Sequence, residues 1–162
     1  MKRFYSYSLS EEITNVATHG VGIVMSLVVC IIFLVKGAQA DSWLVNLSFV
    51  LYMFGVVSSY TASTVYHAIP STRQKSKAIA RKLDHAAIYW HIAGSYSPVM
   101  LIAMHDVAYW GWGIFFFCWL CGIIGTFISL FSLKKHNYIE TACFVLMGLV
   151  ILVAIKQFYE CV

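Results

Sequence analysis

Long apolar stretches alternate with short polar ones along almost the whole chain. A helix needs about 20 apolar residues to cross a bilayer core about 30 Å thick, and five stretches approach that length. We therefore expect five transmembrane helices, at residues 16–35, 43–67, 84–104, 110–131 and 139–158. Because these spans and their short connections use up the 162 residues, the sequence predicts one all-α domain over 1–162, a polytopic transmembrane helix bundle.

Local motifs refine this pattern. Ser8 and Glu11 have the spacing of a capping box, so the first helix is expected to start near Ser8 to Ser10. In the second span, Gly55, Ser59 and Ser63 recur every fourth residue. Gly122 and Gly125 form a similar pair in the fourth span. Small residues on one face allow membrane helices to approach closely, which supports a packed bundle.

The composition excludes a water-soluble domain. The chain is 60% hydrophobic and only 11% charged, whereas a soluble domain is about a quarter charged. The net charge of +4 is no signal for nucleic-acid binding, and no nucleic-acid partner is expected. Four of the five cysteines lie in apolar runs, so Cys118 and Cys121 are expected to pack as small hydrophobic residues despite their CxxC spacing.

The basic residues predict the orientation. Loops on the cytoplasmic side of a membrane carry an excess of Lys and Arg. With the N-terminus inside, nine of the 11 basic residues face the cytoplasm, and only Lys36 and Lys156 face outward. Trp43, Tyr109 and Trp110 then lie at the outer interface, where aromatic side chains are enriched. The nine expected inside are Lys2, Arg3, Arg73, Lys75, Lys77, Arg81, Lys82, Lys134 and Lys135.

Ionisable residues in the spans are the candidate functional groups, because each costs about 2.5–3.5 kcal/mol at the bilayer centre. His19, His67 and Asp84 all fall near cytoplasmic helix ends, and His91 shares a helix face with Asp84. Imidazole and carboxylate groups suit zinc, so one interpretation is a metal or catalytic pocket. The other is that these side chains reach the headgroups or bond to neighbouring helices. The spacing alone leaves both open.

At these residues the sequence resembles the hemolysin III family, within the wider group of the progestin and adiponectin receptors. The matching blocks occur in the family's order and spacing through most of the chain. They are EEITNVATHG at 11–20, STVYH at 63–67, KLDH at 82–85 and IAGSYSP at 92–98.

The resemblance implies seven helices, a cytoplasmic N-terminus and a zinc site at the cytoplasmic face. It makes His67 a zinc ligand and Asp84 the holder of a zinc-bound water, with Ser63 in the same motif as His67 and His19 at the family's first-helix histidine. The family's remaining zinc ligands form a His-x-x-x-His pair on the seventh helix, which this chain does not contain. We therefore expect a C-terminally truncated product with an incomplete zinc site, in which His91 is the natural substitute ligand.

Three functions follow as hypotheses. The first is a hemolysin III-like protein of the bacterial inner (plasma) membrane, involved in cytolysis or membrane homeostasis. The second is a zinc-dependent hydrolase of a lipid amide or ester, with Asp84 orienting water and Ser63 stabilising the site. The third, a passive pore or structural protein, ranks last because the polar residues cluster at one end. Membrane lipid is the expected partner, and self-association into a homo-oligomer is a further expectation.

Overall fold

The computed structural model describes residues 7–107, 109–131 and 137–161, and these contain helices and no strands. This confirms the predicted all-α polytopic bundle. Two of the eight elements are not α-helices: η1 is a π-helical turn and η2 a 3-10 helix. In chain order the elements are α1 (Leu9–Gln39), α2 (Trp43–Ala68), α3 (Gln74–Pro98), η1 (Val99–Ala103), α4 (Trp110–Phe131), α5 (Asn137–Leu149), η2 (Val150–Ala154) and α6 (Ile155–Cys161).

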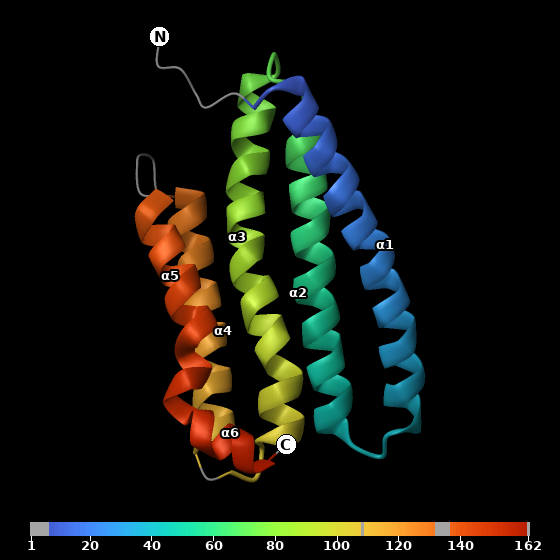
Figure 1. Ribbon diagram of the computed structural model, residues 1–162, viewed down its shortest axis with the longest axis vertical. Coiled ribbons are helices and arrows are strands. Elements are labelled where there is room, and N and C mark those ends of the chain that lie inside the picture. Colours follow the sequence, from blue (N-terminus) through green and yellow to red (C-terminus); the bar gives the residue numbers. More distant parts are fainter. Residues whose placement is uncertain (1–6, 108, 132–136, 162) are drawn as a thin grey trace.

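The helix α3 is the centre of the bundle. It packs against α2 on one side and against α4 and α5 on the other, while α1 packs on α2 (Figure 1). We call the end where α1 begins, α2 ends and α3 begins the basic end. The fourth helix ends and the fifth begins at this same end, whereas the α1–α2 and α3–α4 connections lie at the opposite end.

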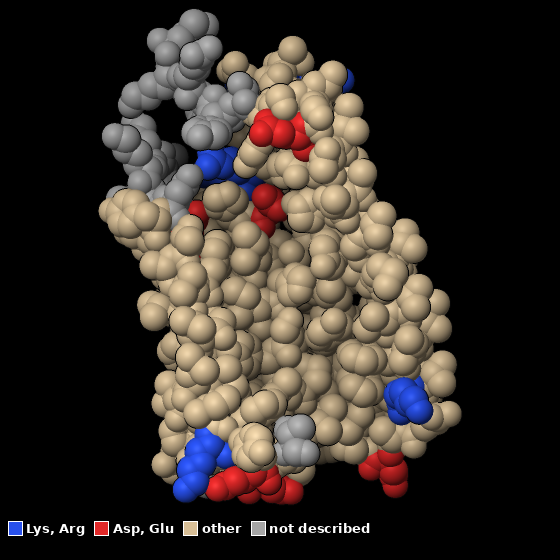
Figure 2. All heavy atoms as spheres, in the orientation of Figure 1, with Lys and Arg blue, Asp and Glu red and all other residues tan. Residues whose placement is uncertain are grey.

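Four stretches are long and apolar enough to cross a membrane: Leu9–Gln39, Trp43–Ala68, Trp110–Phe131 and Tyr138–Cys161. The fifth long helix, α3, carries charged residues in its first three turns. On the face shown in Figure 2, charged side chains gather at the two ends and an uncharged band separates them. Together these features indicate a multi-pass membrane protein.

The expected start of the third helix, at residue 84, is wrong. Helix α3 begins at Gln74, so most of the basic segment expected as a loop is helical and Asp84 lies in the third turn. Two physical causes account for the difference. Ala, Lys, Arg and Gln are good helix formers, and the ammonium groups of Lys77 and Lys82 donate to the main-chain carbonyls of Ile69 and Leu130.

The first helix starts where the capping motif predicts. The side chain of Ser8 accepts from the Glu11 amide at 3.3 Å, and the Ser8 amide donates to the Glu11 carboxylate at 2.6 Å. Both bonds satisfy main-chain donors that a helix N-terminus leaves without partners. The capping-box prediction is confirmed.

Seven of the 11 basic residues lie in the described part of the chain, and their positions can be compared with the predicted separation of charge between the two ends. Arg73 precedes α3, and four more basic residues lie in its first turns, at the basic end. Lys36 and Lys156 lie at the opposite end. The other four residues counted for the orientation, Lys2, Arg3, Lys134 and Lys135, lie outside the described residues.

Glycines set the distance between the central helices. A Cβ added at Gly55 would collide with the main-chain carbonyl of Trp90, so α2 and α3 touch there through their backbones. A Cβ at Gly125 would collide with the ring of Tyr89, which is 1% exposed at the α3–α4 contact. The stripes of small residues therefore fall where helices meet, as membrane packing requires.

This packing predicts that Gly55→Ala is destabilising. Because the added methyl group meets a main-chain atom that cannot rotate away, we expect the free energy of unfolding to fall by about 1–3 kcal/mol. The measurement is SDS titration in mixed micelles followed by circular dichroism. Gly113→Ala is the matched control, since nothing lies within 4 Å of a Cβ at that position. Equal stability of the two variants would contradict the close α2–α3 contact.

Candidate functional site

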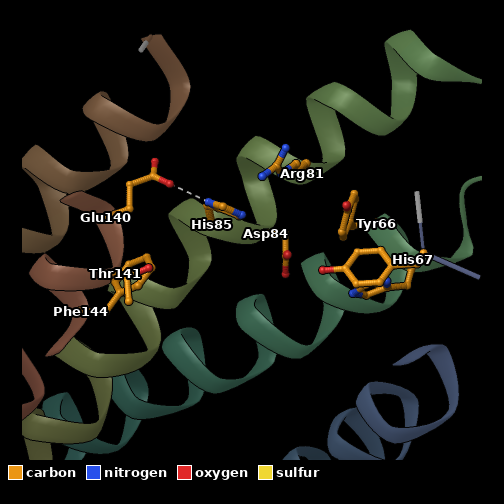
Figure 3. Close-up of a pocket in the computed structure, with 9 residues that line it drawn as sticks. Tyr66, His67, Arg81, Asp84, His85, Glu140, Thr141 and Phe144 are labelled. Carbon is orange, nitrogen blue, oxygen red and sulfur yellow. Dashed lines mark hydrogen bonds and ion pairs between the residues drawn. The ribbon is translucent and has the colours of Figure 1, made fainter. Parts of the chain in front are cut away.

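A cavity of about 370 Å³ lies near the basic end, between α2, α3 and α5. Its volume falls in the range of about 300–1,000 Å³ that ligand pockets occupy. In Figure 3, Asp84 lies between the His85–Glu140 pair on one side and His67 on the other. The lining residues are Tyr7, Tyr66, His67, Arg81, Asp84, His85, Glu140, Thr141 and Phe144. An apolar bundle thus contains a pocket whose wall is largely ionisable or polar.

One wall is built by a network that joins three helices. The His67 Nδ1 atom of α2 lies 2.7 Å from the Glu12 carboxylate of α1, whose other oxygen accepts from Lys77 Nζ of α3 at 2.7 Å. These side chains are only 8%, 15% and 16% exposed, respectively. The carboxylate fixes the orientation of the His67 ring. It leaves Nε2 without a hydrogen-bond partner among the described residues.

Sequence reasoning missed Glu12 and Lys77. Glu11, Asn15 and His19 recur every fourth residue in the sequence, but the structure uses Glu11 for the helix cap. The signal was present, because Glu12, Asn15 and His19 also follow helical spacing. The Asn15 amide lies 3.4 Å from the same His67 nitrogen, so this face of α1 does meet α2.

The predicted histidines are brought together only in part. The rings of His19 and His67 are parallel, with centroids 6.0 Å apart. Tyr60 stands 6.0 Å from the His19 ring and 5.7 Å from the His91 ring. Tyr60 therefore separates His91 from the other two imidazoles.

Ser63 and Asp84 occupy different surroundings. Ser63 is buried one turn before His67 on α2, and the cavity wall does not include it. Asp84 faces the cavity and makes no hydrogen bond or ion pair with another described residue. Asp84 thus has a carboxylate available to a ligand, whereas Ser63 is held in the helix contact.

A second polar cluster, also missed from the sequence, forms the opposite wall. His85 Nδ1 lies 2.7 Å from a Glu140 oxygen, and the Ser129 hydroxyl donates to the other oxygen at 2.9 Å. The three side chains come from α3, α5 and α4, respectively. No spacing rule could link residues 11 and 55 positions apart in sequence. The Glu140 carboxylate is therefore fully engaged and holds α5 to the rest of the bundle.

The available donors do not fit a complete zinc site. Among the described residues, no three His, Cys, Asp or Glu side chains come close enough to share a metal ion. Tetrahedral zinc needs four protein ligands, or three protein ligands and a water molecule. Cys118 offers no alternative, since it is fully buried in the apolar core.

The chain is similar to known proteins over nearly its whole length. The profile of the family described as "Haemolysin-III related" matches residues 7–162. The chain is 32% identical over 152 residues to the protein named Hemolysin-3 of Bacillus cereus, covering 94% of this chain and 68% of the relative. It is 29% identical over 153 residues to the Hemolysin-3 homolog of Bacillus subtilis (strain 168), covering 94% and 70%. No solved structure gives a significant match.

The donor set predicts weak zinc binding by this chain alone. Because His67 and His19 are the only imidazoles brought close together in the described part of the chain, we expect purified protein to retain well under one zinc per chain. The zinc content per chain is measured by elemental analysis after dialysis, for the parent protein and for His67→Ala. Stoichiometric zinc that disappears in His67→Ala would show that further ligands complete the site.

Proposed function

The chain belongs to the haemolysin-III-related family, and on that premise we propose that it acts in membrane homeostasis or cytolysis by binding membrane lipid in the cavity. The supporting observation is the cavity itself, where ionisable side chains from three helices surround about 370 Å³ within an apolar bundle. Ionisable groups at such positions are costly and are retained mostly for function. A passive pore is less favoured, because it needs polar groups along the whole span.

We propose a location in the bacterial inner (plasma) membrane, with the basic end in the cytoplasm. The support is the charge distribution. Five described basic residues lie at or near the start of α3, whereas Lys36 and Lys156 are the only described ones at the opposite end. The positive-inside rule then puts the cavity in the inner leaflet and the N-terminus inside.

The alternative proposal is a zinc-dependent hydrolase of a lipid amide or ester. The feature that favours it is His67, whose ring is oriented by Glu12 and which shares the cavity with Asp84. Carboxylate partners of this kind commonly orient metal-binding imidazoles. Zinc would need ligands beyond those of the described residues, and in this proposal a second copy in a homo-oligomer supplies them.

The orientation predicts which positions a membrane-impermeant maleimide labels. In a Cys161→Ser background, Gln39→Cys should react in intact spheroplasts, because it lies exposed at the opposite end. Thr72→Cys, exposed at the basic end, should react only after permeabilisation. The reverse pattern would place the cavity in the outer leaflet.

The function predicts that cavity residues control the cellular effect. Overexpression in a bacterial host should change membrane lipid composition or release haemolytic activity. His67→Ala and Asp84→Asn should abolish that effect at equal expression. Lys156→Ala, at the opposite end and 81% exposed, is the control and should behave as the parent. If both cavity variants retained the full cellular effect, the cavity would be excluded as the functional site.

A further inference from the structure

All seven acidic side chains lie in the part of the chain that the structure describes, so the surroundings of each can be compared. At the basic end, Glu11 accepts from Ser8, Glu12 is paired with His67 and Lys77, and Glu140 is paired with His85 and Ser129. Three more lie at the opposite end: Asp41, Asp106 and Glu160. Asp84 is the one carboxylate in the cavity without a partner among the described residues.

Arg81 is the one Lys or Arg among the described residues that line the cavity. Lys77 is paired with Glu12, and Lys82 donates to the Leu130 carbonyl at 2.7 Å. Arg81 lines the cavity but makes no hydrogen bond or ion pair with another described residue. Since every acidic side chain is among those just counted, no side-chain carboxylate of the described residues forms an ion pair with its guanidinium. A half-buried charge without a partner is costly unless a ligand supplies one.

The two unpaired charges are neighbours. Arg81 and Asp84 are three residues apart on α3, a spacing that puts side chains next to each other on a helix surface. They form no ion pair with each other, and both face the cavity. The cavity therefore presents one positive and one negative group side by side, an arrangement complementary to a zwitterion.

The cavity also lies at the level where two of the helices end, which is where lipid headgroups are expected. Ser129 is in the last turn of α4 and Glu140 in the first turn of α5, so both helices end at the level of this wall. The first turns of α3 extend beyond them (Figure 1). Near the basic end, the face in Figure 2 is hollowed, with charged side chains of both signs in the hollow. A headgroup in the cavity can reach Arg81 and Asp84 while its acyl chains stay in hydrocarbon.

We propose that the cavity binds the headgroup of a phospholipid that carries a primary ammonium group, with Arg81 binding the phosphate and Asp84 accepting from the ammonium. This rests on the proposed function, whose lipid it specifies. The planar guanidinium binds phosphate oxygens through paired hydrogen bonds. The Asp84 carboxylate distinguishes a primary ammonium, which donates hydrogen bonds, from a quaternary one, which does not.

The test measures lipid binding by the purified full chain in mixed micelles. The probes are phosphatidylethanolamine, phosphatidylcholine and phosphatidylglycerol with identical acyl chains, titrated while tryptophan fluorescence is recorded. Phosphatidylethanolamine should bind roughly tenfold tighter than the other two, since a hydrogen bond to a charged group contributes about that factor. Equal binding of all three would overturn the assignment of Asp84.

The variants separate the two contacts. Arg81→Gln should weaken the binding of all three phospholipids roughly tenfold or more, and Arg81→Lys should retain part of that affinity. Asp84→Asn should remove only the preference for phosphatidylethanolamine. Lys156→Gln is the control for a charge change at the opposite end, and circular dichroism verifies that each variant is folded. Unchanged binding by folded Arg81→Gln would overturn the proposal.

Two further comparisons distinguish a failure of the headgroup assignment from a failure of the proposed function. Free phosphoethanolamine should compete with the phospholipid for the cavity only at much higher concentration, because it lacks acyl chains. Competition at equal concentration would show that the ligand is a soluble molecule and not a lipid. If Arg81→Gln binds lipid normally while His67→Ala still abolishes the cellular effect, the headgroup assignment fails and the proposed function stands. If His67→Ala and Asp84→Asn retain the cellular effect, the proposed function fails whatever lipid the cavity binds.

Discussion

A charge surrounded by hydrocarbon must find a partner, and this constraint organises the whole molecule. Every main-chain group in a span must be bonded within the protein, which leaves the chain only helices with which to cross the membrane. Charged side chains face the same requirement. They collect at the two ends of the bundle, and at the basic end they are joined across helices by the Glu12–His67–Lys77 and His85–Glu140 contacts.

The central helix carries both the packing and the chemistry. Its middle section meets the α2 backbone at Gly55, and the ring of Tyr89 packs against Gly125 of α4. Its first turns extend past the apolar section and carry Lys77, Arg81 and Asp84. Because the middle of α3 is fixed by close packing, the side chains of its first turns are held in defined positions around the cavity.

The two candidate activities depend mainly on different residues of the same cavity. A hydrolase uses His67 as a metal ligand, and the donors that would complete its zinc site are absent among the described residues. Lipid binding uses Arg81 and Asp84, which are already in place with no other carboxylate or cation among the described residues to satisfy them. The fixed His67 ring is compatible with both, because Glu12 occupies only its Nδ1 atom.

The sequence was sufficient for the fold class, the family and the helix cap at Ser8, since each of these depends on residues close together in the chain. It misplaced the start of α3, because charged residues were taken as a loop although they are good helix formers with carbonyl partners on other elements. Only the tertiary structure decided that Glu12 rather than Glu11 meets His67, that Tyr60 separates His91 from His19, and that Glu140 holds His85. Helical periodicity fixes which side chains share a face of one helix, but it contains no information on how neighbouring helices are rotated and shifted against each other.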